Sequence, residues 1–341
     1  MTHFVGLDAS KGTTSICIMD RDGQIVREGT VETNPAAIVG YLRGERRRYR
    51  RIGLEAIGFA SWLYQGLAKA GLPVICIEAR HAHGVLKARL NKTDRNDAKG
   101  IAELMRVGIY RAVHIKTRES QEAKLLLTTR RMLKRKQRDI DNLVRSTLLQ
   151  YGQKLAAGSL RSFGQRAASL AAVDPLLKEL VETLLEVRNV LAAKALAIEA
   201  RIEDVVREDP VCQRFLTVPG VGALTALAFR SAIDVPQRFD KSRNVGVHLG
   251  LTPRAFRSGT IYRQGHISKC GDQDARSALY NAAVTILREQ GKASELKAWA
   301  RELLKTKKYR VAAVAVARRL AVVLHRMWLD GTDFNCQPIR T

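Results

Sequence analysis

The chain has 341 residues with 58 Lys and Arg against 33 Asp and Glu, a net charge of +25, and a hydrophobic share of 46%. That share is ordinary for a globular protein and excludes a disordered or fibrous chain, while the length allows two or three compact units. The basic excess favours nucleic acid over a membrane as partner, because no amphipathic anchor or spanning segment accompanies it.

The basic excess is spread along the chain. Residues 1–120 carry 20 basic and 12 acidic groups, residues 121–205 carry 15 and 10, and residues 206–341 carry 23 and 11. We therefore expect a nucleic-acid path across several domains. The five cysteines are scattered without a Cys-x-x-Cys pair, which argues against a disulfide framework and structural zinc. Since Asp8 and Lys11 interrupt any secretory apolar segment, we expect a soluble cytoplasmic protein.

Residues 1–108 alternate strand and helix signals. The expected strands are 4–8, 14–20, 24–33, 51–58 and 72–79, and the expected helices are 34–45, 60–71 and 94–108. Turn signals at Lys11–Gly12 and Asp20–Gly23 join the first three strands as a meander. This order predicts an α+β sheet with mixed strand directions, which matches the ribonuclease-H-like plan.

Four acids in this region are candidate metal ligands. Asp8 and Glu55 each close a short apolar strand, and Asp94 and Asp97 lie three residues apart at an expected helix start, where they share one face. In the ribonuclease-H-like plan, acids at the ends of the first and fourth strands and on a late helix meet. Converging carboxylates hold Mg²⁺ or Mn²⁺, which take hard oxygen ligands, and paired metals about 3.5–4 Å apart serve in-line phosphoryl displacement. Spacing alone equally allows four unrelated surface acids.

Residues 119–206 carry few strand signals and two long stretches with apolar residues at helical spacing. We expect two long antiparallel helices joined near residues 156–165, with coiled-coil pairing between chains. The first helix carries a cationic run for which we expect contact with a nucleic-acid backbone, although a solvated face is the usual role of such a run. The run consists of Arg130, Arg131, Lys134, Arg135, Lys136 and Arg138.

The segment after Asp209 is rich in glycine and basic residues. A helix ending at Thr217, a hairpin at residues 219–222 and a new helix from residue 223 form a helix-hairpin-helix pattern. Gly220 and Gly222 would let backbone N–H groups approach a phosphate, although a plain helix–helix turn also uses glycine.

We expect three domains along the chain. They are the α+β sheet domain at residues 1–118, the long helices at residues 119–206 and a mostly helical domain at residues 207–335.

Two serines beyond that hairpin lie among glycines and cations. The cations are Arg254, Arg257, Arg263 and Lys269. A serine hydroxyl attacks a phosphodiester only when its proton is removed and fixed cations or metal meet the developing charge, and we expect Ser258, in a loop, to meet this condition. Residue types alone leave open a loop serine that contacts backbone. For Ser268 we expect a cap on the helix from Asp272 or a single phosphate contact.

The ordered motifs resemble the insertion sequence 110 family of transposases, the DEDD recombinases guided by a bridge RNA and related to the Piv invertase. The resemblance covers almost the whole chain and rests on GLDASK, LEAIG, NKTDRNDAKGIAEL, VPGVGALTA, RNVGVHLGLTPRAFRSG and ISKCGDQDARSALYNAA. Each motif is unspecific alone, and the ordered combination is specific. Arg257 and Cys270 depart from the residues that are common in the family, which leaves the contacts of that loop open.

The resemblance implies a RuvC-like N-terminal domain, a coiled-coil middle and a C-terminal transposase domain. It implies that Asp8, Glu55, Asp94 and Asp97 bind Mg²⁺, and that Ser258 attacks a DNA phosphate to give a covalent phosphoserine intermediate. The implied partners are donor and target DNA, a bridge RNA from the element's non-coding end, and dimers that pair into tetramers. In such a tetramer the acids and the serine come from different subunits, acting on nucleoid DNA of a bacterial cytoplasm.

Two other functions fit parts of the sequence. A RuvC-like DNA junction nuclease that uses metal-activated water explains the acids and the charge but gives Ser258 no role. A non-catalytic junction-binding or RNA-binding scaffold explains the basic helices and predicts binding that is indifferent to the four acids. Trapping of a covalent protein–DNA species distinguishes the recombinase from both.

Overall fold

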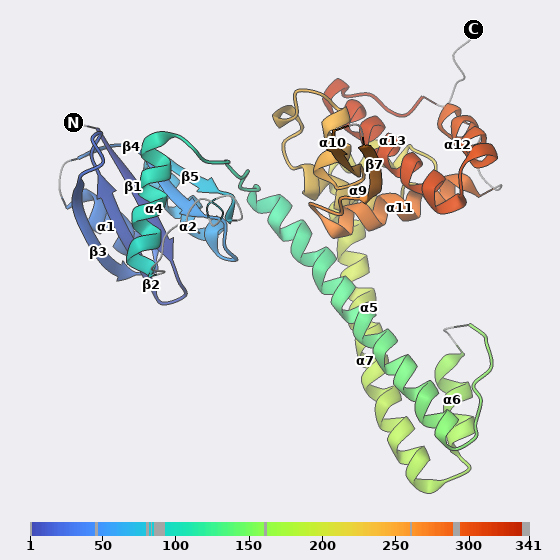
Figure 1. Cartoon of the computed structure of the whole chain (residues 1–341). Coiled ribbons are helices and arrows are strands. Elements are labelled where there is room, and N and C mark those ends of the chain that lie inside the picture. The colour runs from blue at the N-terminus through green and yellow to red at the C-terminus, as the bar shows by residue number, and fades with distance from the viewer. Residues whose placement is uncertain are drawn as a thin grey trace. The chain divides into compact units, whose positions relative to one another are not determined.

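The computed structural model describes residues 2–44, 47–79, 82, 84, 93–159, 162–259, 261–288 and 294–335. At positions 258, 261 and 262 it describes the backbone only. The chain divides into two compact units, residues 1–116 and 117–341 (Figure 1). None of the helices in the described part of the chain combines the length and the hydropathy that a membrane span needs.

Unit 1 is a five-stranded mixed sheet in the order β3-β2-β1-β4-β5. The first three strands are antiparallel neighbours, and β1 pairs in parallel with β4, which pairs in parallel with β5. The strands are β1 Thr2–Ala9, β2 Thr13–Met19, β3 Ile25–Glu32, β4 Arg48–Glu55 and β5 Val74–Ile77, and the helices are α1 Pro35–Arg43, α2 Ala60–Lys69 and α4 Asp94–Val107. This topology confirms the predicted ribonuclease-H-like fold.

Helices cover both faces of the unit 1 sheet, and the strands bury alternate residues on each face. Val5 and Leu7 belong to the core under α1 and α2, whereas Phe4 packs with Ile101 and Met105 of α4. The even-numbered positions at the end of β1 therefore face α4. The same alternation in β4 puts Leu54 under α1 and α2 and Gly53 against α4.

Unit 2 begins with two long helices, as predicted. α5 Arg118–Gln150 and α7 Pro175–Glu208 run antiparallel: Arg130 lies 2.7 Å from Glu199, and Asp141 lies 2.6 Å from Arg188 further along (Figure 1). α7 begins at Pro175 because Asp174 caps it by accepting from the Leu177 backbone N–H. The connection between the two helices includes a further helix, α6 Phe163–Ala171.

The remainder of unit 2 packs short helices around one apolar core that includes Phe215 and Phe229. The helices are α8 Pro210–Leu216, α9 Ala223–Ile233, α10 Arg243–His248, α11 Gln273–Leu287, α12 Glu295–Thr306 and α13 Tyr309–Asp330, with a 3₁₀ turn at Pro236–Arg238. The helix-hairpin-helix prediction is confirmed as local structure, since α8 and α9 flank a turn in which Gly220 has φ of 88°. The division of residues 119–341 into two domains stays a prediction.

One element was predicted wrongly. The segment around Ser258, expected as a loop, is a two-stranded antiparallel hairpin of β6 Pro253–Ser258 and β7 Ile261–Ile267. Its described side chains are mostly exposed on both faces, so the sequence lacks the apolar alternation that announces a half-buried strand.

Candidate functional site

Asp8 and Glu55 stand side by side at one edge of the unit 1 sheet. The parallel register pairs Gly6 with Gly53 and Leu7 with Leu54, so the next positions along the two strands are Asp8 and Glu55. Each acid lies two residues after a glycine that faces α4, so both acids are on the face of the sheet that α4 covers. Both side chains are half-buried. Two carboxylates from separate segments therefore share one edge and one face.

The glycines two residues before these acids bring α4 close to the sheet. A Cβ on Gly6 would lie 2.0 Å from the Ala98 carbonyl oxygen, and a Cβ on Gly53 would lie 2.6 Å from Ile101 Cγ2. Only glycine allows this approach. Gly6 and Gly53 were not predicted as site residues, although the Gly-Leu-acid pattern repeated at 6–8 and 53–55 is a signal that could have found them.

The first turn of α4 continues towards the same edge. The residues that pack on the sheet are Ala98, Ile101 and Ala102, and Asp94 and Asp97 precede the first two by four positions each, on the same helix stripe. Since α4 runs antiparallel to β1, with Phe4 near Ile101 and Gly6 near Ala98, the stripe leads from Gly6 towards Asp8.

The start of α4 is fixed by local interactions. Thr93 caps the helix by accepting from the Asn96 backbone N–H at 3.2 Å, and two acids in the first turn suit the positive end of the helix dipole. Arg95, which lies between the two acids, turns to Glu28 on β3, with Nε 2.7 Å from the carboxylate. Arg95 is mostly exposed, so this pair contributes orientation more than stability.

The four carboxylates suit a hard divalent cation by chemistry and by placement on one sheet edge. Across the described ranges, however, no group of three or more His, Cys, Asp or Glu side chains is arranged to hold an ion. Asp8, Glu55, Asp94 and Asp97 thus share an edge of the sheet by backbone position, and their side chains do not form such a group. The Glu55 carboxylate lies near Cys76, where burial first and this charge second raise the thiol pKa to about 11.

In unit 2, Ser258 is the last residue of β6, immediately before the turn at Gly259, whose φ is 55°. Strand alternation places Arg254 and Phe256 on one face of β6, and the register adds Arg263, which pairs with Phe256. Arg257 pairs with position 262. The hairpin that ends β6 at Ser258 therefore carries two of the predicted cations on one face.

The base of this hairpin is closely packed. A Cβ on Gly250 would lie 2.3 Å from the Cys270 carbonyl oxygen, and a Cβ on Gly271 would lie 2.0 Å from that of His248. Arg276 joins the two ends, because its Nη1 donates to the Leu249 carbonyl at 3.1 Å and to the Cys270 carbonyl at 2.8 Å. Arg276 was not identified from the sequence, where it is one arginine of an ordinary helix.

The predicted cap role of Ser268 is wrong. α11 is capped by Asp272, whose carboxylate accepts from the backbone N–H groups of Asp274 and Ala275. Asp272, directly after Gly271, occupies the N-cap position, and Ser268 lies four residues before it. Ser268 Oγ instead lies 3.5 Å from the Cys270 backbone N, and Lys269 next to it is exposed.

The predicted cationic run on α5 divides into two parts. Arg130 is paired with Glu199, and Arg131 lies 2.5 Å from Asp274, which also accepts from Lys124. These pairs join α5 to α7 and to the start of α11. The remaining predicted contacts on α5 are the exposed Arg135, Lys136 and Arg138 and the half-buried Lys134.

The helix-hairpin-helix has a packing role that competes with phosphate binding. A Cβ on Gly220 would lie 3.0 Å from Ile286 and 3.2 Å from the Ala282 carbonyl oxygen, so this glycine seats the turn on α11. Gly222 caps α9 through its carbonyl, which accepts from Thr225 and Ala226. The predicted phosphate contacts of Gly220 and Gly222 stay predictions.

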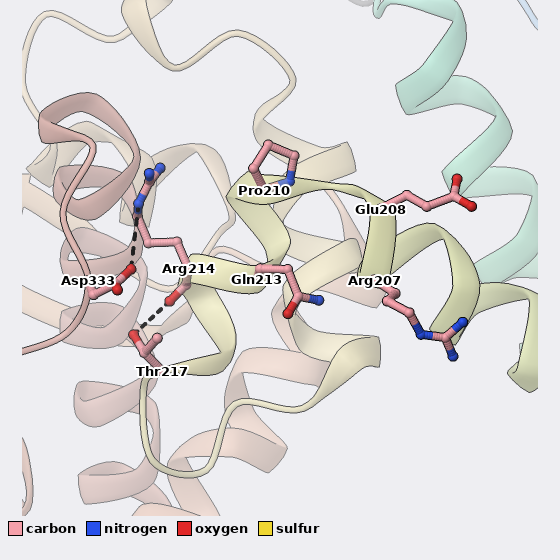
Figure 2. A pocket seen from close by; sticks show the side chains of 7 residues that line it. All are labelled: Arg207, Glu208, Pro210, Gln213, Arg214, Thr217 and Asp333. Carbon is pink, nitrogen blue, oxygen red and sulfur yellow. Dashed lines mark hydrogen bonds and ion pairs between the residues drawn. The ribbon is translucent and has the colours of Figure 1, made fainter.

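A cavity of about 350 Å³ lies beside α8 (Figure 2). Its lining is Arg207, Glu208, Pro210, Gln213, Arg214, Thr217 and Asp333. Arg214 Nε lies 3.7 Å from Asp333, and the Thr217 hydroxyl donates to the Arg214 carbonyl at 2.7 Å. None of the predicted site residues lines this cavity.

Two family models match the chain. A DEDD transposase model of the IS110 type matches residues 5–153, and the model described as Transposase IS116/IS110/IS902 family matches residues 212–298. The first match includes the four acids, and the second includes the β6–β7 hairpin.

Curated relatives extend the similarity to almost the full length. The transposase for insertion sequence element IS1111A of Coxiella burnetii is 28% identical over 97% of this chain and 91% of its own length. A probable family 20 transposase of Pseudomonas aeruginosa is 26% identical over 94% and 95%. Among solved structures, Thermus thermophilus RuvC is 13% identical with a TM-score of 0.26, over 33% of this chain and 99% of that protein.

Proposed function

From the premise that this chain belongs to the IS110 family of transposases, which cut and rejoin DNA, we propose that it recombines DNA through a covalent serine–phosphate intermediate. The divalent-metal dependence that a DEDD transposase implies is assigned here to Asp8, Glu55, Asp94 and Asp97, with Mg²⁺ or Mn²⁺ as the ion. Ser258 is the proposed nucleophile.

One observation supports the assignment of the acids. Asp8 and Glu55 occupy matching positions on the adjacent parallel strands β1 and β4. They lie on the face of the sheet that α4 covers, and α4 carries Asp94 and Asp97. A bound divalent ion would supply charge stabilisation to a phosphoryl group at this edge. The residues themselves supply hard oxygen donors from three separate segments, which is what a site with few protein ligands needs.

The proposed role of Ser258 is supported by its place at the tip of a cationic hairpin. Attack by Oγ on phosphorus forms the serine–phosphate bond and breaks the bond from phosphorus to a deoxyribose oxygen. The hydroxyl proton leaves to a base, and the departing oxygen gains a proton. Attack by another deoxyribose hydroxyl reverses these steps and releases the serine, so the bond energy is conserved through rejoining. Arg254 and Arg263, on the same face, would position the phosphate oxygens.

The proposed partners are donor and target DNA, a bridge RNA that selects them by base pairing, and further copies of the chain. Only 6% of residues are aromatic while 58 are Lys or Arg, a composition suited to backbone contact more than to base reading. We further propose that dimers pair into tetramers, so that unit 1 of one subunit acts with unit 2 of another, on nucleoid DNA in the bacterial cytoplasm.

Trapping of the intermediate tests this function. Purified protein with its RNA, Mg²⁺ and DNA carrying the element's ends should yield a protein–DNA species that survives denaturant and carries the DNA on the peptide containing Ser258. Ser258→Ala should bind RNA and DNA normally yet give neither adduct nor cleaved strand. Ser268→Ala should retain the adduct.

Other outcomes identify the alternatives. Strand cleavage by Ser258→Ala without any adduct would make the protein a RuvC-like junction nuclease that uses metal-activated water. An adduct lost in Ser268→Ala and kept in Ser258→Ala would move the nucleophile to Ser268. Binding without cleavage in the wild type, indifferent to all four acids, would favour the scaffold.

A further inference from the structure

An exposed aromatic ring lies on the hairpin that carries Ser258. Phe256 is 63% exposed, which is unusual for a phenylalanine, and among the hairpin side chains that the structure describes it is the single large apolar one with such exposure. Its ring lies over Gly265, with Cε2 3.9 Å from where a Cβ of that glycine would stand. The ring therefore lies next to Gly265, and most of the Phe256 side chain stays exposed to solvent.

The position of Phe256 relates it to the candidate nucleophile. It precedes Ser258 by two residues along β6, and its cross-strand partner is Arg263. Two residues along a strand span about 6.6 Å, roughly two spacings between stacked bases. A base next to a phosphate held at Ser258 is therefore within reach of the ring.

The charge around the ring selects the kind of ligand. Between Asp240 and Asp272 the chain has six Lys or Arg and no Asp or Glu. Arg254 and Arg263, which share the face of Phe256, are both exposed. An aromatic ring among cations, without acids, has the composition of a surface that stacks bases and contacts phosphates of single-stranded nucleic acid. A protein partner would need further exposed apolar surface, and among the described side chains of the hairpin no other large apolar one is so exposed.

We propose that Phe256 stacks on an unpaired DNA base next to the reacting phosphate, while Arg254 and Arg263 contact the flanking phosphates. The identity of that phosphate rests on the proposed role of Ser258, whereas the stacking itself does not. Phe256 is thus a positioning residue, which holds a single strand across the hairpin face.

Binding of single-stranded oligodeoxyadenylate and of the same sequence as a duplex tests the proposal. Phe256→Leu keeps an apolar side chain and removes the ring, and Phe256→Trp keeps a larger ring. We expect Phe256→Leu to bind the single strand roughly tenfold more weakly with duplex binding unchanged, and Phe256→Trp to bind as the wild type does, with tryptophan emission quenched by the single strand. Val247→Ala, at an exposed apolar residue of α10, is the matched control and should change neither.

A face-swapped variant makes the test specific for geometry. The double change Ala255→Phe and Phe256→Ala moves the ring to the opposite face of β6 and leaves composition almost constant. It should bind the single strand as weakly as Phe256→Leu does. Wild-type affinity in the swapped variant would overturn the proposal, because the face would not matter.

The remaining outcomes are separable from those for Ser258. If Phe256→Leu binds the single strand like the wild type, the inference fails even where the serine adduct forms normally. If Phe256→Leu instead changes the oligomeric state in sedimentation while DNA binding is intact, the ring belongs to a protein interface and the inference also fails. If the wild type forms no adduct but the ring-dependent binding is observed, the proposed nucleophile fails and the stacking stands.

Discussion

The two units hold their candidate chemistry in opposite ways. In unit 1 the four acids are attached to a sheet and a helix that touch through Gly6 and Gly53, so their backbone positions follow from strand register and helix packing. In unit 2 Ser258 lies at the tip of a two-stranded hairpin, fixed by glycine contacts and Arg276 at its base. A lone hairpin is marginally stable in water, so this second arrangement depends on its anchor and on what binds it.

The two sites should differ in how firmly their geometry is held. Sites on packed strands and helices keep their geometry better than sites on projecting segments. We infer that the acids are placed before substrate binds, whereas the serine hairpin takes its final position on the DNA. Changes in unit 1 should therefore act on chemistry or on global stability, and changes in unit 2 on local order and single-strand contact.

The largest expected effect is loss of a carboxylate. Asp8→Asn or Asp97→Asn removes a charged oxygen donor from the sheet edge, which should weaken divalent-metal binding and lower the cleavage rate roughly 10³-fold or more, corresponding to several kcal/mol at the transition state. Nucleic-acid binding should survive, since neither substitution removes a cation. Asp22→Asn, at an exposed acid in the β2–β3 turn, is the control. Near-normal recombination by both site variants would contradict the metal assignment.

A side chain at one of the glycine contacts should disturb the placement of the acids in unit 1. Gly6→Ala would place a methyl group 2.0 Å from the Ala98 carbonyl oxygen, and α4, with Asp94 and Asp97, must move away from Asp8 and Glu55 to relieve the clash. Overpacking of this kind costs about 1–3 kcal/mol or more, which lowers the melting temperature of a domain of this size by about 4–8 °C per kcal/mol. Gly58→Ala is the matched control, since a Cβ there meets nothing within 4 Å. Calorimetry that finds Gly6→Ala as stable as Gly58→Ala would refute the close packing.

The sequence predicted the elements of unit 1 well because their signals are local. Turn residues separate apolar alternations, and Thr93 with two acids marks the start of α4. The meeting of Asp8 with Glu55 depends on the pairing of strands 47 residues apart, which required the analogy to a known fold. Pattern alone also allowed four unrelated acids.

Two features of unit 2 could not be predicted from the sequence, for different physical reasons. The β6–β7 hairpin is exposed on both faces, so no periodic apolar pattern marked it and its glycines and cations resembled a loop. The partners of the α5 cations are distant: Arg131 meets Asp274 across 143 residues. A run of cations looks the same in sequence whether acids neutralise it or nucleic acid does.

Removal of Arg276, which anchors the β6–β7 hairpin, should loosen that hairpin in unit 2. Arg276→Ala deletes the donor to the Leu249 and Cys270 carbonyls, each bond being worth about 1–3 kcal/mol. Amide exchange across residues 250–271 should accelerate, and adduct formation should slow about tenfold, while duplex affinity and the stability of unit 1 stay unchanged. Arg288→Ala, at an exposed arginine at the end of the same helix, controls for charge. Unchanged exchange in Arg276→Ala would show that the two glycine contacts hold the hairpin alone.

The smallest effect, thiol labelling, sharpens the comparison by reporting on each unit separately. Burial, the largest cause, raises the pKa of Cys17 in unit 1 and of Cys212 in unit 2 to about 12, whereas Cys270 at the hairpin base is exposed. Because the thiolate is the reactive form, native protein at pH 8 should be alkylated at Cys270 and spared at both buried thiols, whose labelling rises only as the pH approaches their raised values. Peptide mapping along a denaturant series should then show Cys17 labelled at lower denaturant in Gly6→Ala than in the wild type, with Cys212 unmoved. Labelling of Cys17 and Cys212 at the same denaturant concentration in every variant would mean that the two units unfold together. The two units would then differ in the placement of their candidate site residues but not in their stability.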